Sequence, residues 1–176
     1  MKMSFSERLR SLFDDPFREI KNFGVASDQR VVDIGAGSGY FTIPAAEAVG
    51  PKGLVYSVEP DPVRYKKIVR RAESEGLSNV RVVNTTVEEM EEIPDGGVDL
   101  AFTVHALHHF EDKNRGLVEI RRILRNGGSL YIRDIIRGLI FRHGTRRDEV
   151  GILSEAGFTK VEILEVGRYL KARLTK

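Results

Sequence analysis

Three glycines at alternate positions, Gly35, Gly37 and Gly39, follow a β-branched run and precede a helical pattern. Glycines between a strand and a helix let the backbone approach a ligand closely, at the sheet edge where doubly wound proteins bind ligands. A dinucleotide-binding GxGxxG loop would place its third glycine where Tyr40 stands. A GxxxxGK[ST] phosphate loop would need a lysine that is absent here. The spacing therefore argues against both phosphate-binding loops.

Two acidic residues accompany this loop. Asp33 ends the strand pattern before it, and Glu59 ends the next one. Glu59 lies roughly 20 residues beyond Gly39, the offset at which an acid accepts both ribose hydroxyls. A carboxylate at Asp33 favours a cationic ligand group over a pyrophosphate. Together they predict a nucleoside ligand without a phosphate tail.

Four histidines are candidates for proton transfer: His105, His108, His109 and His143. A histidine base that removes the proton from a hydroxyl or an enolisable carbon raises the rate of reaction at that atom by about 10²–10⁴-fold. We take His108 and His105 as the catalytic candidates. The alternative is that these side chains pack and hydrogen-bond the start of the next helix.

No metal site is expected around these histidines. His105 has no paired carboxylate in its own loop, and Glu111 and Asp112 fit the start of a helix better.

Arginines dominate the segment after the predicted strand 129–135. Arg137, Arg142 and Arg146 alternate with the apolar run 139–141. We expect them to hold a substrate that has an apolar body and an anionic group. The alternative is a set of surface arginines that flank a short loop.

The elements that must position these residues follow from hydrophobic patterning. The predicted strands are 31–34, 54–58, 80–83, 98–104, 129–135, 161–166 and 169–174. The predicted helices are 40–49, 62–76, 87–92, 114–125 and 147–156. Only two residues separate the last two strands, which predicts an antiparallel hairpin. The expected fold is α/β, a three-layer sandwich with a mostly parallel seven-stranded sheet and this C-terminal hairpin.

The N-terminal segment has its own pattern. Residues 4–23 carry apolar side chains roughly every four positions, which predicts one amphipathic helix or two short ones broken near Pro16. We expect an N-terminal helical flap over residues 1–24 and one ligand-binding domain over 25–176.

Composition limits the functional classes. The chain has 176 residues, of which 41% are hydrophobic and 31% charged, as in one soluble globular domain. Its net charge of +2 is too small to indicate nucleic-acid binding by itself, although residues 113–147 are strongly basic. The absence of cysteine excludes disulfides, thiolate nucleophiles, Cys-ligated zinc and iron–sulfur chemistry. With no apolar run of membrane-spanning length, we expect a cytoplasmic protein.

The run Asp33-x-Gly35-x-Gly37-x-Gly39 resembles the first motif of class I S-adenosylmethionine-dependent methyltransferases. The run Leu107-His108-His109 and the Gly127-Gly128 turn are similar to the small-molecule branch related to quinone-biosynthesis C-methyltransferases. The resemblance implies a Rossmann-like methyltransferase fold, S-adenosyl-L-methionine as cofactor and S-adenosyl-L-homocysteine as product.

The same resemblance implies which residues bind the cofactor. Glu59 corresponds to the acid that binds the ribose. Thr86 stands where the family typically has Asp, so its hydroxyl with the amide of Val87, or Glu88, would contact the adenine. The implied cofactor-binding residues are Asp33, Gly35, Ala36, Gly37, Gly39, Tyr40, Glu59, Pro60, Thr86, Val87 and His105.

We therefore predict methyl transfer to a small-molecule acceptor, mainly by proximity and in-line orientation, with possible histidine assistance. Two alternatives stay open: an RNA or protein methyltransferase, and a catalytically silent cofactor-binding partner subunit. The Asn/Asp-Pro-Pro-Tyr/Phe signature of amine methylation is missing, because the predicted strand runs into Thr103-Val104-His105-Ala106. The arsenic branch of the family relies on thiolates, so the absence of cysteine argues against it. A homodimer stays open as the assembly.

Overall fold

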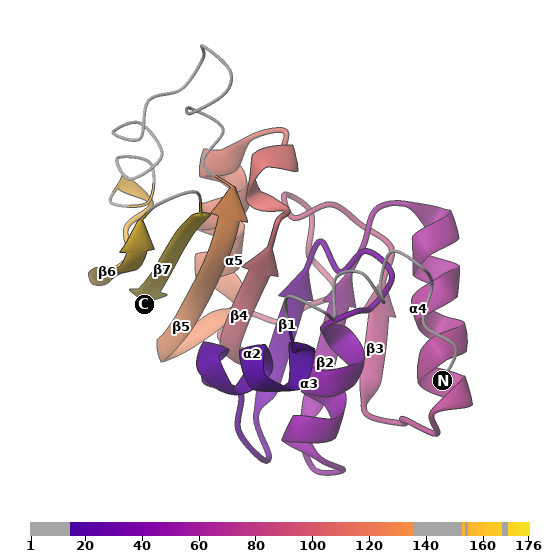
Figure 1. Ribbon diagram of the computed structural model, residues 1–176. Helices are drawn as coiled ribbons and strands as arrows, with labels where there is room; N and C mark the ends of the chain where they lie inside the picture. Colours follow the sequence, from indigo (N-terminus) through magenta and orange to yellow (C-terminus); the bar gives the residue numbers. More distant parts are fainter. Residues whose placement is uncertain (1–14, 136–152, 154, 167–168) are drawn as a thin grey trace.

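A single mixed sheet forms the centre of the computed structural model, which describes residues 15–135, 153, 155–166 and 169–176. The strand order is β3-β2-β1-β4-β5-β7-β6 (Figure 1). β1 to β5 are parallel to one another, and β7 runs antiparallel to β5 and β6. The strands are β1 (Arg30–Ile34), β2 (Leu54–Val58), β3 (Val80–Val83), β4 (Val98–Val104), β5 (Leu124–Ile135), β6 (Lys160–Val166) and β7 (Tyr169–Thr175). The predicted sheet and its C-terminal hairpin are confirmed.

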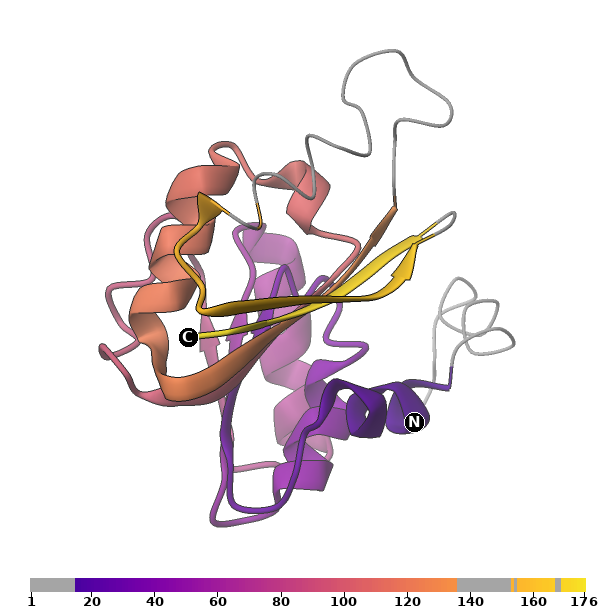
Figure 2. The ribbon, with the colours of Figure 1, turned by 90° about the vertical axis from the view of Figure 1, so that its left-hand side faces the viewer.

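Helices cover both faces of the sheet. α2 and α3 lie on one face and α5 lies on the other (Figure 2). α4 packs beside α3 and against β3. The described helices are α2 (Pro16–Phe23), α3 (Thr42–Val49), α4 (Pro62–Ser74), the 3₁₀ turn η1 (Leu107–His109) and α5 (Lys113–Ile123). The three-layer arrangement is therefore confirmed. None of the helices in these described ranges is long and apolar enough to cross a membrane.

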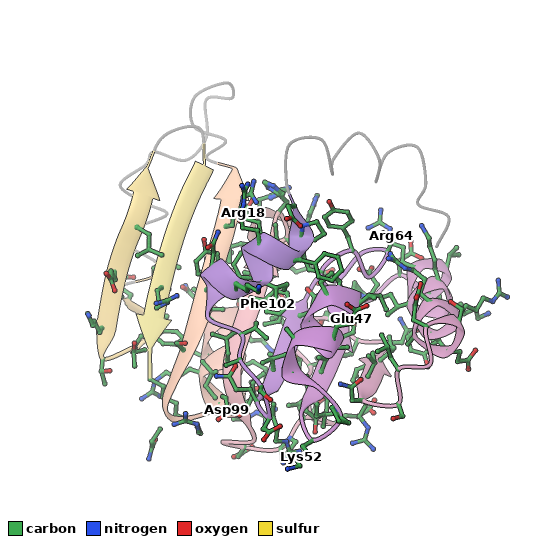
Figure 3. The ribbon with its side chains drawn as sticks, turned by 60° about the horizontal axis from the view of Figure 1, so that its bottom comes forward. Arg18, Glu47, Lys52, Arg64, Asp99 and Phe102 are labelled. Carbon is green, nitrogen blue, oxygen red and sulfur yellow. The ribbon has the colours of Figure 1, made fainter. Side chains whose placement is uncertain are left out.

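The central parallel strands β1, β2 and β4 are buried on both faces, which explains their largely apolar runs. Val31, Val55 and Phe102 pack under α2 and α3, whereas Val32 and Tyr56 pack on the side of α5. Figure 3 shows Phe102 beneath α2 and α3. A one-residue shift of register would exchange these two sets of side chains.

Aspartates begin three of the helices. Asp15, Asp61 and Asp112 each accept backbone N–H bonds from the first turn, which satisfies donors that have no partner within the helix. Pro16 and Pro62 follow two of them at the first helical position, where a missing N–H costs nothing. These local signals explain why the predicted starts of α4 and α5 lie within one residue of the observed starts.

Two predicted elements are wrong in detail. Residues 87–92 form turns instead of a helix, because a helix this short nucleates poorly. The guanidinium of Arg122 also donates a hydrogen bond to the backbone carbonyl of Met90. α5 ends at Ile123, and β5 begins at Leu124, so the Gly127-Gly128 turn lies inside the strand as an irregularity opposite β4. Most of the predicted helix 147–156 lies outside the described residues.

α2 is fastened to the sheet by packing and by charge. Phe23 is fully buried and stacks on Tyr131, with ring centroids 4.4 Å apart. Glu19 pairs with Arg133 of β5 at 3.1 Å, and Arg173 of β7 donates to the carbonyl of Phe23. Residues 1–14 of the predicted flap lie outside the described part, and the division at residue 24 stays a prediction.

Candidate functional site

A cavity of about 650 Å³ lies at the carboxyl ends of β1, β2 and β4. Its volume is in the range of small-molecule and cofactor sites, and this edge is where open α/β sheets bind ligands. Every predicted cofactor-binding residue except Gly39 lines it. The described lining consists of residues 33–38, 40–41, 58–60, 64, 67, 86–88, 104–106 and 109–111.

The glycine loop needs its glycines for two different reasons. Gly35, Gly37 and Gly39 all have positive φ, at 71°, 60° and 77°. A Cβ at Gly35 would overlap the methyl group of Ala106 on the opposite wall. At Gly37 no heavy atom lies within 4 Å of that position, so the backbone there is open to a ligand. Gly39 instead faces Ile68 of α4, which explains its absence from the lining.

Glu59 joins the end of β2 to the glycine loop. Its carboxylate accepts from the N–H of Gly37 at 2.7 Å and from the N–H of Asp61 at 3.1 Å. The side-chain amide of Asn84 donates to the carbonyls of Glu59 and Pro60 at 2.8 and 2.9 Å. Sequence reasoning missed Asn84, which holds this turn from the neighbouring strand.

Asp33 is a buried carboxyl group at the floor of the cavity. The hydroxyl of Thr42 donates to it at 2.7 Å, and Thr42 is also hydrogen-bonded to Ser57 at 3.0 Å. Burial raises the pKa of Asp33 to about 7; the bond from Thr42 acts in the opposite direction, and the charge of Glu59 adds to the rise. A cationic ligand group beside Asp33 would therefore favour its ionised form.

The predicted histidines divide into two sets. His105 and His109 line the cavity, whereas His108 is not among its described lining residues. His108 instead bonds Asp134 at the end of β5, with 2.7 Å between Nδ1 and Oδ1 and 3.0 Å between its backbone N and Oδ2. This is the geometry of the alternative, in which a histidine holds the segment before the helix.

Several lining residues were not predicted. Arg64 and Lys67 bring positive charge from α4, and Phe110 and Glu111 come from the segment before α5. Figure 3 shows Arg64 well away from Asp99, which lies near the opposite end of the sheet. The available signal was position, since Arg64 and Lys67 lie in the first two turns of the helix that follows Glu59.

Glu88, named above as an alternative adenine contact, also lines the cavity. Its Oε1 accepts from the N–H of Asp112 at 3.2 Å, so it joins the residues after β3 to the start of α5.

Four predicted site residues, Arg137, Arg142, Arg146 and His143, lie outside the described residues. Within the described part, no three His, Asp or Glu side chains are grouped so that they could hold a metal ion.

Comparison with known proteins places this geometry among methyltransferases. Residues 32–132 match the family described as "Methyltransferase domain". The arsenite methyltransferase of Halobacterium salinarum is 27% identical over 79% of this chain and 39% of its own length. The demethylmenaquinone methyltransferase of Geobacillus stearothermophilus is 27% identical over 62% of this chain and 46% of its own. This chain thus spans less than half of either relative.

A solved structure has the same extent as this chain. The crystal structure of an S-adenosylmethionine-dependent methyltransferase from Aquifex aeolicus is 26% identical, with a TM-score of 0.77 over 99% of this chain and 98% of that one. The resemblance that the motifs indicated is therefore confirmed.

Proposed function

The chain belongs to the class I S-adenosylmethionine-dependent methyltransferases, and on that premise we propose that it transfers a methyl group from this cofactor to a small-molecule acceptor. The cavity carries the proposal, because it brings the glycine loop, Asp33 and Glu59 together at one edge of the sheet. The two carboxyl groups, Asp33 and Glu59, would repel a phosphate. They suit a nucleoside with a cationic amino-acid tail.

Each end of the cofactor has proposed partners. Glu59 accepts the ribose hydroxyls through lone pairs left by its two backbone bonds. Asp33 attracts the methionine ammonium, and the open backbone at Gly37 lets the cofactor approach. Thr86 and the amide of Val87, or Glu88, contact the adenine, since all three residues line the same wall.

Transfer from a sulfonium is an in-line displacement, so orientation of the acceptor can supply most of the acceleration. Any histidine assistance comes from His105 or His109, because these two line the cavity. His108 is not proposed as a base, since it is not among the described lining residues and Asp134 holds it against the end of β5.

The acceptor is proposed as a small molecule because the named relatives are arsenite and demethylmenaquinone methyltransferases. This chain contains no cysteine, so it offers no thiolate to a soft acceptor such as arsenite. An organic acceptor with an oxygen, nitrogen or carbon nucleophile fits better. Binding of its anionic group by Arg137, Arg142 or Arg146 stays part of the proposal.

The test uses methyl-labelled S-adenosylmethionine and a fractionated extract of the organism that makes the protein. Label is counted in the small-molecule, RNA and protein pools, with Glu59→Ala as the control. We expect label in the small-molecule pool and none with the variant. Label only in RNA or protein would show that the acceptor is a macromolecule and would contradict the small-molecule proposal. Cofactor binding without transfer to any pool would indicate a silent subunit.

A further inference from the structure

Asp134 holds the segment that carries the cavity's histidines. This segment, residues 105–111, joins β4 to α5 and contains η1. The two carboxylate oxygens of Asp134 bond the Nδ1 and the backbone N–H of the same residue, His108. The backbone carbonyl of the preceding residue, Arg133, accepts the N–H of His105 at 2.8 Å. Consecutive residues at the end of β5 thus make three hydrogen bonds to this segment.

His105 needs such support because its backbone is strained. Its φ is +57°, in the left-handed region that residues with a Cβ seldom adopt. Strained backbone persists only where neighbouring contacts fix it. The contacts on either side of this position come from Arg133 and from the Asp134–His108 pair.

The pair also fixes the orientation of two imidazole rings. A carboxylate oxygen only accepts, so Nδ1 of His108 carries the hydrogen in this bond. The His109 ring packs on the His108 ring, with centroids 4.0 Å apart. The His108 and Asp134 side chains are 11% and 6% exposed, and such burial strengthens a hydrogen bond. Asp134 thus contacts His108, and His108 contacts His109, which lines the cavity.

We propose that Asp134, acting through His108, is the positioning residue that sets the wall of the cavity formed by His105 and His109. The proposal rests on the proposed function, since that wall faces the reacting groups only if the cavity holds the cofactor. Asp134 and His108 lie outside the described lining, so neither is proposed as a catalytic residue. Glu59 is held instead by the backbone of Gly37 and Asp61, so cofactor affinity should depend on the pair only weakly.

The test is imidazole nitrogen NMR of the full chain labelled with ¹⁵N-histidine. Ring signals are assigned by replacing one histidine at a time. The variants are Asp134→Asn and His108→Gln, and the matched control is Asp99→Asn, a carboxylate that pairs with Arg125 at the other end of β4. We expect a hydrogen on Nδ1 of His108 in the parent protein. Asp134→Asn should remove that signature and shift the ring signals of both His105 and His109, and Asp99→Asn should shift neither.

Each outcome decides the proposal. Unchanged His105 and His109 signals in Asp134→Asn would overturn it and leave the pair a local structural contact. If Asp134→Asn does not fold, His108→Gln carries the test, and an unmoved His105 signal in that variant would overturn the proposal, since the His109 ring packs directly on the replaced ring.

Ligand binding separates this proposal from the proposed function. S-adenosylhomocysteine should bind Asp134→Asn within about threefold of the parent affinity, while kcat with an identified acceptor falls about 10- to 100-fold. Failure of the parent protein to bind S-adenosylhomocysteine would refute the proposed function, and the ring signals of the free protein would still decide whether Asp134 positions the histidines.

Discussion

The carboxylate of Glu59 accepts a hydrogen bond from the backbone N–H of Gly37 at 2.7 Å. This bond connects the end of β2 to the loop after β1 and fixes both before any ligand arrives. Glu59 is 3% exposed, yet its carboxylate borders the cavity. A carboxylate has about four acceptor positions, so two backbone bonds leave capacity for ribose hydroxyls. Such preorganisation lowers the entropy lost on binding.

Gly35 and Gly37 predict different costs for the same substitution. Gly35→Ala adds a methyl group that overlaps Ala106 in addition to the strain of a positive φ. We expect a loss of about 2–4 kcal/mol in the free energy of unfolding, against about 1 kcal/mol for Gly37→Ala. Urea denaturation of the two variants measures this difference.

Ala106→Gly provides the control for the overlap. It should recover part of the loss in Gly35→Ala and none of the loss in Gly37→Ala, because only the first variant contacts residue 106. Equal losses in the two alanine variants would contradict the proposed cause, which is the close approach of the two cavity walls.

Asp33 predicts a pH dependence of stability without ligand. Burial raises the pKa of Asp33 to about 7 in the folded protein, so between about pH 4 and pH 7 the folded state retains a proton that the unfolded chain releases. This contribution to stability is complete below about pH 4 and is lost as the pH rises to 7, by at most about 1.4 kcal/mol per unit. Asp33→Asn should remove this decline, as the difference between urea titrations of parent and variant would show. Parallel pH profiles would refute it.

The same carboxyl group predicts proton release on cofactor binding. At pH 6, below the raised pKa of Asp33, the group is mostly protonated, and the cationic cofactor favours its ionised form. Calorimetric binding enthalpies at pH 6 should therefore differ between buffers with different ionisation enthalpies. The difference should vanish in Asp33→Asn. Identical enthalpies for the parent protein in both buffers at pH 6 would show that Asp33 does not titrate with binding.

The ion pair between Glu19 and Arg133 should contribute to the stability of α2 on the sheet. Glu19→Ala leaves the guanidinium of Arg133, which is 8% exposed, without this carboxylate partner. We expect a loss of about 3–5 kcal/mol in the free energy of unfolding. Glu162→Ala is the matched control, because its pair with Lys160 is exposed and should cost no more than about 1 kcal/mol. Similar losses in both variants would contradict the importance of burial at Arg133.

Local sequence patterns were sufficient for the sheet and for most of the cavity. Asp33, the glycine loop and Glu59 all lie at ends of strands with clear patterns, and parallel strands bring their carboxyl ends to one edge. The partner of His108 could not be predicted this way, because Asp134 lies 26 residues further along the chain. Asn84 was missed for the same reason, since its partners are backbone carbonyls that no composition signal reveals.

The most direct test of the account is calorimetric titration of S-adenosylmethionine into the parent protein and into Glu59→Ala. We predict one binding site per chain in the parent protein and at least about a tenfold loss of affinity in the variant, because a charged hydrogen-bond acceptor contributes about 1.5–3 kcal/mol. Circular dichroism must show that the variant is folded. Absence of binding to the parent protein, or equal affinity in a folded variant, would contradict the assignment of this cavity as the cofactor site.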